Sequence, residues 1–148
     1  MSVTLPTVED TRAFGARLAS VLRPGDLLVL TGPLGAGKTA LVQGIGAGLK
    51  VGGRVASPTF VIARVHAGAL SLVHVDAYRL GSLAEVDDLD LDYDAAEVVT
   101  VVEWGHGLVE QLNDARLEIV LSRSSDSEVR TADLLPHGGD WAQRISAL

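Results

Sequence analysis

The most constraining feature of this chain is a glycine-rich segment, GPLGAGKT at residues 32–39, which fits the pattern G-x-x-x-x-G-K-[ST]. The apolar run DLLVLT at residues 26–31 leads straight into it and predicts a buried strand, and the residues that follow it predict a helix. Backbone N–H groups can surround a polyphosphate only where no side chain intrudes, and the glycines of this segment permit that approach. Strand, loop and helix together predict a phosphate-binding loop. The alternative is a glycine-rich turn that caps a helix and binds nothing.

We expect a bound nucleotide to contact the whole loop and the start of the helix. Lys38 is a mobile positive charge that can reach the β- and γ-phosphates, and the Thr39 hydroxyl is a ligand for magnesium. The start of the helix adds unpaired N–H groups and the positive end of the helix dipole. The expected contacts are Gly32, Pro33, Leu34, Gly35, Ala36, Gly37, Lys38, Thr39 and Ala40.

The base of that nucleotide is expected to be adenine. Guanine-specific phosphate-loop proteins typically read their base with an N-K-x-D sequence, whereas the sole asparagine here, Asn113, is followed by aspartate and alanine. ATP and Mg²⁺ are therefore the expected ligands.

Two acidic residues stand at the ends of predicted strands, where open α/β sheets place their ligands. Asp76 closes one strand and Glu103 closes the other. Either acid can hold magnesium through water, with the other orienting or deprotonating the attacking water; alternatively both face solvent. Trp104 is expected either beside the nucleotide or in the core. His74 is expected to form a supporting hydrogen bond rather than to bind metal.

The residues Ser57, Pro58 and Thr59 fall in the connection after the second helix. Nucleotide switches commonly keep a hydroxyl there that senses the γ-phosphate, although the same residues also fit an ordinary turn. Arg79, just beyond the first acid, is a candidate contact for phosphate or for a partner.

The rest of the chain predicts one α/β domain, residues 1–148, with a mixed β-sheet flanked by helices, as in a single P-loop NTPase-like domain. Thr7 is expected to cap a first helix that ends at residues 23–25. Glycines at 44, 46 and 48 in the second helix require compensating packing or close approach of another segment, and the sequence leaves both open. The other expected elements are hairpins of 61–65 with 70–75 and of 117–121 with 129–135, a strand at 98–102, and helices from about Ser82, Gly105 and Asp140.

The amino-acid composition excludes several classes of function. The 148 residues are 47% apolar and contain no cysteine, which describes a globular domain without thiol catalysis or thiolate zinc sites. The net charge of −7 includes an acidic run at residues 85–97, expected to be a solvated face or a partner-facing patch. With two lysines and no basic stripe, direct binding of RNA or DNA is not expected. No signal-like start or membrane-length apolar run is present, so we expect cytoplasmic residence without membrane contact.

Four segments, taken in order, resemble a known family: LTGPLGAGKTALVQGI, SPTF, HVDAYRL and VVEWG. Together they resemble the bacterial ATPase subunit of tRNA threonylcarbamoyladenosine synthesis, the TsaE family, over residues 30–108. The phosphate loop alone is generic, whereas its combination with the other three segments is specific. Two departures from the family pattern are Pro33, where an acid is frequent, and Asp90, where a glycine is frequent.

The resemblance implies a small ATPase that joins two partner proteins, of the TsaD and TsaB type, which install threonylcarbamoyl on an adenosine beside the tRNA anticodon. It implies that tRNA is held by those partners. Matching motif positions assign Lys38 and Thr39 to phosphate and magnesium, Asp76 and Glu103 to the metal and water, and residues 57–59 to a switch. Tyr78, Arg79 and Trp104 occupy motif positions without a firm role.

The predicted function is thus a magnesium-dependent ATP hydrolase, weak alone, that supports the tRNA-modifying complex. One alternative is a phosphate-loop small-molecule kinase, in which Asp76 accepts a proton from a substrate hydroxyl. Another is an ATP-sensing partner protein that does not hydrolyse its nucleotide.

Overall fold

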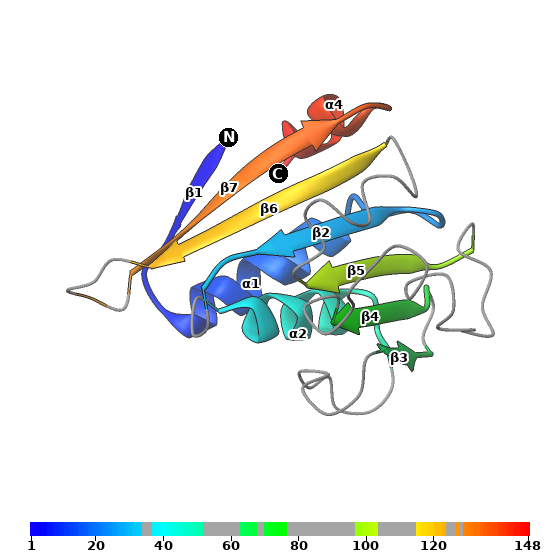
Figure 1. Ribbon diagram of the computed structural model, residues 1–148, viewed down its shortest axis with the longest axis horizontal. Coiled ribbons are helices and arrows are strands. Elements are labelled where there is room, and N and C mark those ends of the chain that lie inside the picture. Colours follow the sequence, from blue (N-terminus) through cyan, green and yellow to red (C-terminus); the bar gives the residue numbers. More distant parts are fainter. Residues whose placement is uncertain are drawn as a thin grey trace.

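The computed structural model describes residues 1–33, 37–51, 63–67, 70–76, 97–103, 115–123, 127 and 129–148. Within these residues, seven strands form one sheet in the order β1-β7-β6-β2-β5-β4-β3 (Figure 1). The strands are β1 (Ser2–Leu5), β2 (Leu27–Thr31), β3 (Ala63–His66), β4 (Leu72–Asp76), β5 (Val99–Glu103), β6 (Arg116–Arg123) and β7 (Arg130–His137). The helices are α1 (Val8–Ala19), α2 (Lys38–Gly48) and α4 (Trp141–Ile145).

The centre of the sheet is parallel and its margins are antiparallel. Strand β2 pairs in parallel with β5 and β6, and β4 pairs in parallel with β5. Strands β3, β7 and β1 run antiparallel to their neighbours β4, β6 and β7. The predicted mixed sheet and both predicted hairpins are therefore confirmed. Because β2, β4, β5 and β6 share one direction, their carboxyl ends meet at one edge of the sheet.

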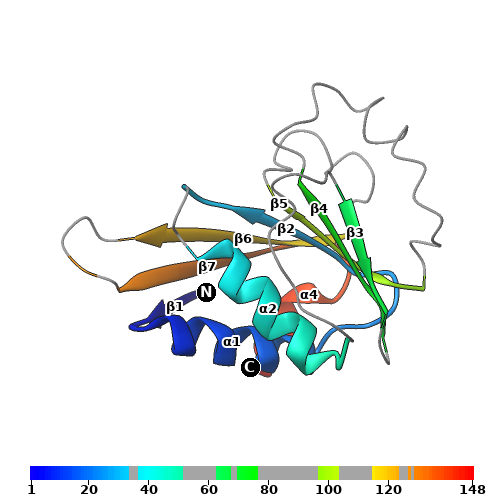
Figure 2. The same ribbon diagram turned by 90° about the horizontal axis from the view of Figure 1, so that it is seen from below.

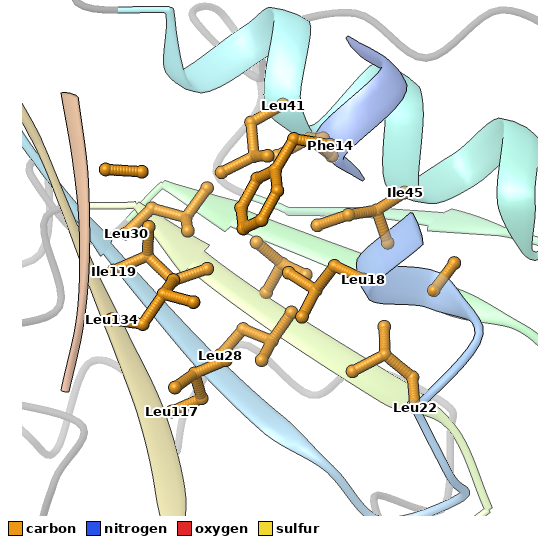
Figure 3. Close-up of a cluster of buried hydrophobic side chains, with 14 of the residues drawn as sticks. Phe14, Leu18, Leu22, Leu28, Leu30, Leu41, Ile45, Leu117, Ile119 and Leu134 are labelled. Atoms are coloured by element: carbon orange, nitrogen blue, oxygen red, sulfur yellow. The ribbon is translucent and has the colours of Figure 1, made fainter. Parts of the chain in front are cut away.

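Helices α1 and α2 lie side by side on one face of the sheet (Figure 2). Their apolar residues meet those of the central strands in the main core, shown in Figure 3. Phe14 and Leu18 come from α1 and Ile45 from α2, and all three are nearly or fully inaccessible to solvent. This shared core fixes the second helix over the strand that precedes it.

The first helix begins as predicted and ends earlier than predicted. The Thr7 hydroxyl accepts a hydrogen bond from the Asp10 N–H, and the Asp10 carboxylate accepts one from the Thr7 N–H, which completes a capping box. The helix ends at Ala19, whereas the apolar pattern predicted continuation to residues 23–25. Val21 and Leu22 donate to carbonyls three residues back, so the chain tightens into a turn that still directs Leu22 into the core.

The glycines of α2 allow close approach of α1, which settles the question left open by the sequence. A Cβ on Gly44 would lie 2.1 Å from the Arg12 carbonyl oxygen, and one on Gly48 would lie 2.5 Å from the Ala19 Cβ. On the facing helix, a Cβ on Gly15 would lie 2.5 Å from the Leu41 carbonyl oxygen. The backbones therefore touch where these side chains are missing.

The C-terminal segment attaches to the start of β2. As predicted, a short helix, α4, follows Asp140. Arg144 is buried, stacks over the Trp141 ring at 3.8 Å, and forms a paired ion contact with Asp26, to which its Nη1 donates at 3.0 Å. The Arg23 Nη1 donates to the Asp140 carboxylate at 2.8 Å, and this hydrogen bond lowers the pKa of the Asp140 carboxyl. The pair therefore stabilises the fold when the pH is above the ordinary pKa of an aspartate. This stabilisation is lost as the pH falls and the carboxylate is protonated.

Strand β1 was not predicted, because its four residues lie at the margin of the described sheet and pair there with the distant strand β7. The helices expected from Ser82 and Gly105, and the acidic run up to its last residue, lie outside the described residues. None of the described helices is both long enough and apolar enough to span a bilayer.

Candidate functional site

The predicted phosphate loop starts where β2 leaves the sheet. Gly32, with φ of +154°, passes so close to β6 that a Cβ there would lie 2.5 Å from the Leu121 carbonyl oxygen. Gly37, in a left-handed conformation with φ of +100°, caps the start of α2. Both glycines are therefore required by the backbone path, since other residues rarely adopt these angles.

Lys38 is the first residue of α2, and its side chain returns to the loop. The ammonium Nζ donates to the carbonyl oxygen of Gly32 at 2.7 Å and to that of Pro33 at 3.1 Å. Only 7% of the residue is exposed, so a positive charge is buried against the first two residues of the loop. The next two residues, Thr39 and Ala40, form the first turn of the helix, with Thr39 half-buried and Ala40 buried.

The sheet brings the two predicted acids together. Asp76 at the end of β4 and Glu103 at the end of β5 are direct partners in the parallel register. Glu103 is also in register with Leu30 of β2, two residues before the loop. Both acids therefore finish strands at the edge from which the loop departs, as the sequence predicted.

Glu103 has a specific partner, His74. The two side chains are almost fully buried, and the His74 Nε2 lies 2.9 Å from the Glu103 Oε2. With the ring proton placed on Nε2, His74 donates to the carboxylate, and Nδ1 remains a lone pair that is buried without a partner in the described part of the chain. A second ring proton would bury an N–H without an acceptor. His74 thus orients Glu103, as expected of a supporting hydrogen bond.

One further residue lies next to the loop, although no sequence pattern predicts it there. Arg130, the first residue of β7, lies against Gly37: a Cβ built there would be 3.2 Å from the Arg130 Cδ. No motif surrounds this arginine, and the contact joins residues far apart in the chain.

The remaining candidate residues lie outside the described part of the chain, or their side chains do. Among the described residues, no group of three histidine, aspartate or glutamate side chains forms a metal cluster. The Asp76 backbone is described and its side chain is not. The undescribed candidates are Leu34, Gly35, Ala36, Ser57, Pro58, Thr59, Tyr78, Arg79 and Trp104.

A glycine-rich loop between a central parallel strand and a helix, with a buried lysine that donates to the first two carbonyls of the loop, defines a P-loop NTPase-like protein. The family model described as "Threonylcarbamoyl adenosine biosynthesis protein TsaE" matches residues 5–132. The chain belongs to this family, and the resemblance found in the sequence is confirmed.

Curated relatives agree with this assignment. The chain is 49% identical over 141 residues to the tRNA threonylcarbamoyladenosine biosynthesis protein TsaE of Mycobacterium tuberculosis, which covers 88% of this chain and 84% of the relative. It is 52% identical over 138 residues to the protein of the same name from Streptomyces coelicolor, with 88% and 93% covered. The crystal structure of Bacillus subtilis YdiB matches with a TM-score of 0.81 and 31% identity, over 99% of this chain and 92% of that one.

Proposed function

We propose that this protein binds ATP with Mg²⁺ at the loop and hydrolyses it in support of threonylcarbamoyladenosine modification of tRNA. The observation that carries the proposal is the buried Lys38 ammonium on the carbonyls of Gly32 and Pro33, at the edge where Asp76 and Glu103 finish their strands. A positive charge beside a glycine-rich loop is suited to binding phosphate. Two acids at neighbouring strand ends are suited to binding the magnesium ion and the attacking water.

The donor set fits magnesium, which prefers oxygen ligands. Hydroxyl and carboxylate oxygens are available from Thr39, Asp76 and Glu103. Bound there, magnesium would neutralise charge on the phosphate oxygens. On binding ATP, the Lys38 ammonium exchanges the carbonyl oxygens of Gly32 and Pro33 for phosphate oxygens, and the N–H groups at the start of α2 donate to the same anion.

The surroundings of Glu103 support a division of roles between the two acids. Glu103 is 4% exposed and one of its oxygens is engaged by His74, so its other oxygen has a defined direction. Such a carboxylate suits orienting and deprotonating the attacking water. Asp76, its register partner, then serves the metal through water.

The partners in this proposal are the two proteins of the threonylcarbamoyl-transfer complex, of the TsaD and TsaB type. The relatives are named as tRNA threonylcarbamoyladenosine biosynthesis proteins, which supports a role in this tRNA modification. A net charge of −7 with two lysines supports contact with tRNA through those partners rather than directly. Nucleotide state would then control assembly or turnover of the complex.

The decisive experiment measures phosphate release from ATP by the protein alone, with both partners, and with partners and tRNA. Strong stimulation by the partners is expected. Transfer of phosphate to a metabolite would replace the proposal with a kinase. Nucleotide-dependent association without cleavage would replace it with an ATP sensor.

Lys38→Ala is expected to weaken ATP binding by about ten- to a hundredfold, because one charge-assisted contact to phosphate is lost. Calorimetric titration with ATP and Mg²⁺ measures the change. Lys50→Ala is the matched control, since it removes the other lysine, which is exposed beyond the end of α2. Equal affinity of Lys38→Ala and wild type would exclude the lysine from the site.

His74→Leu is expected to lower ATP turnover about tenfold or more while ATP affinity changes little, because Glu103 loses the donor that orients it. His74→Gln should restore part of the turnover, since its amide nitrogen can donate from nearly the same place. Steady-state phosphate release and calorimetry separate the two effects. A parallel loss of affinity and turnover in both variants would contradict the positioning role.

A further inference from the structure

Arg130 lies against Gly37, the last glycine of the phosphate loop. A Cβ built on Gly37 would be 3.2 Å from the Arg130 Cδ, 3.4 Å from the Arg130 Nε and 3.8 Å from the Cγ2 of Thr11 in α1. Gly37 caps α2, and both Gly37 and Arg130 are half-buried. The base of the guanidinium therefore sits against the residue whose backbone opens the anion-binding end of the helix.

The strand pairing of the sheet places the start of β7 next to the phosphate loop. Strand β7 runs antiparallel to β6, so its first residue, Arg130, lies beside the last residue of β6, Arg123. Because β6 is parallel to β2, that end of β6 is at the edge where the loop begins. In the strand order, β7 and β6 lie on one side of β2, and the acid-bearing strands β5 and β4 lie on the other (Figure 1).

We propose that the Arg130 guanidinium binds the nucleotide at its α-phosphate, on the opposite side of the loop from the acids. This inference rests on the proposed function. Asp76 and Glu103 serve the terminal phosphate, where water attacks, so the nucleoside end of the triphosphate extends toward β6 and β7. A guanidinium is always charged and presents a planar set of N–H donors suited to phosphate oxygens.

This placement makes a distinctive prediction, because the α-phosphate is common to ATP and ADP. Arg130 should strengthen the binding of both nucleotides by the same factor. A contact with the terminal phosphate would instead favour ATP alone. The contact also serves binding rather than the chemical step, so it should affect KM and leave kcat nearly unchanged.

The test is calorimetric titration of the full chain with Mg²⁺ plus ATP or ADP. Arg130→Gln, which keeps most of the stem and removes the charge, should weaken both nucleotides by about ten- to a hundredfold. Arg130→Lys should fall between the glutamine variant and wild type. Arg17→Gln, which removes an exposed guanidinium from the last turn of α1, is the matched control and should bind like wild type.

The outcomes separate this inference from the function on which it rests. Wild-type affinity in Arg130→Gln, or a loss confined to ATP, would overturn the assignment while nucleotide binding itself stands. Absence of binding by wild type would overturn the proposed function and this inference with it. If the glutamine variant does not fold, as judged by its thermal melt, wild-type affinity in Arg130→Lys overturns the assignment and reduced affinity supports it.

Discussion

Glu103→Gln should lower ATP turnover by about 100- to 10,000-fold and leave ATP affinity close to that of wild type, because glutamine keeps the shape of the side chain but cannot accept the proton of the attacking water. The geometry favours a large effect, since Glu103 is buried and held by His74 at 2.9 Å. Phosphate release with the partners and tRNA measures turnover, and calorimetry measures affinity. Asp76→Asn should act in the same direction.

Glu118 provides a matched control for this experiment. It is another nearly buried glutamate, 6% exposed, and it also faces a histidine, with the His137 Nε2 at 3.3 Å from its Oε2. Glu118 lies within β6 rather than at the end of a strand beside the loop. Glu118→Gln should therefore leave turnover unchanged. Wild-type phosphate release from Glu103→Gln would remove Glu103 from the chemical step.

Gly44→Ala should reduce the free energy of unfolding by about 3 kcal/mol, because the added Cβ forces two helix backbones apart. The new atom would lie 2.1 Å from the Arg12 carbonyl oxygen and 2.8 Å from its carbonyl carbon, and neither is a flexible side-chain end that can move aside. Helix propensity alone predicts the opposite sign, since alanine is better than glycine inside a helix by about 1 kcal/mol. Urea unfolding monitored by circular dichroism decides between these predictions.

Ala47→Gly is the control within the same helix. Ala47 is exposed, so only the backbone preference operates there, and the expected cost is about 1 kcal/mol. An unfolding free energy for Gly44→Ala equal to or above that of wild type would mean that α1 and α2 are not held at backbone contact.

The phosphate loop could be recognised from the sequence because its chemistry is local. Lys38 and Thr39 follow the glycines directly, and strand, loop and helix are consecutive in the chain. The cap at Thr7 was predictable for the same reason, since its partner is three residues away. The strand-end positions of the two acids were predictable because each acid closes an apolar run, and parallel pairing places the two residues in register.

Other features could not be predicted because they depend on residues distant in the chain. Gly44 has a low helix propensity, and the reason for a glycine at this position is the close approach of the Arg12 backbone in α1. The pairing of His74 with Glu103 needs the register of β4 with β5, and the contact of Arg130 with Gly37 needs the path of β7 across the sheet.

The sequence by itself determined the phosphate loop, the strands around it and the two acids, because hydrophobic period, glycine content and capping act over a few residues. Only the tertiary structure decided the helix contact at Gly44, the orientation of Glu103 by His74 and the approach of Arg130 to the loop. Those contacts arise when the sheet brings separate segments within van der Waals distance, and no local pattern records which segments will meet.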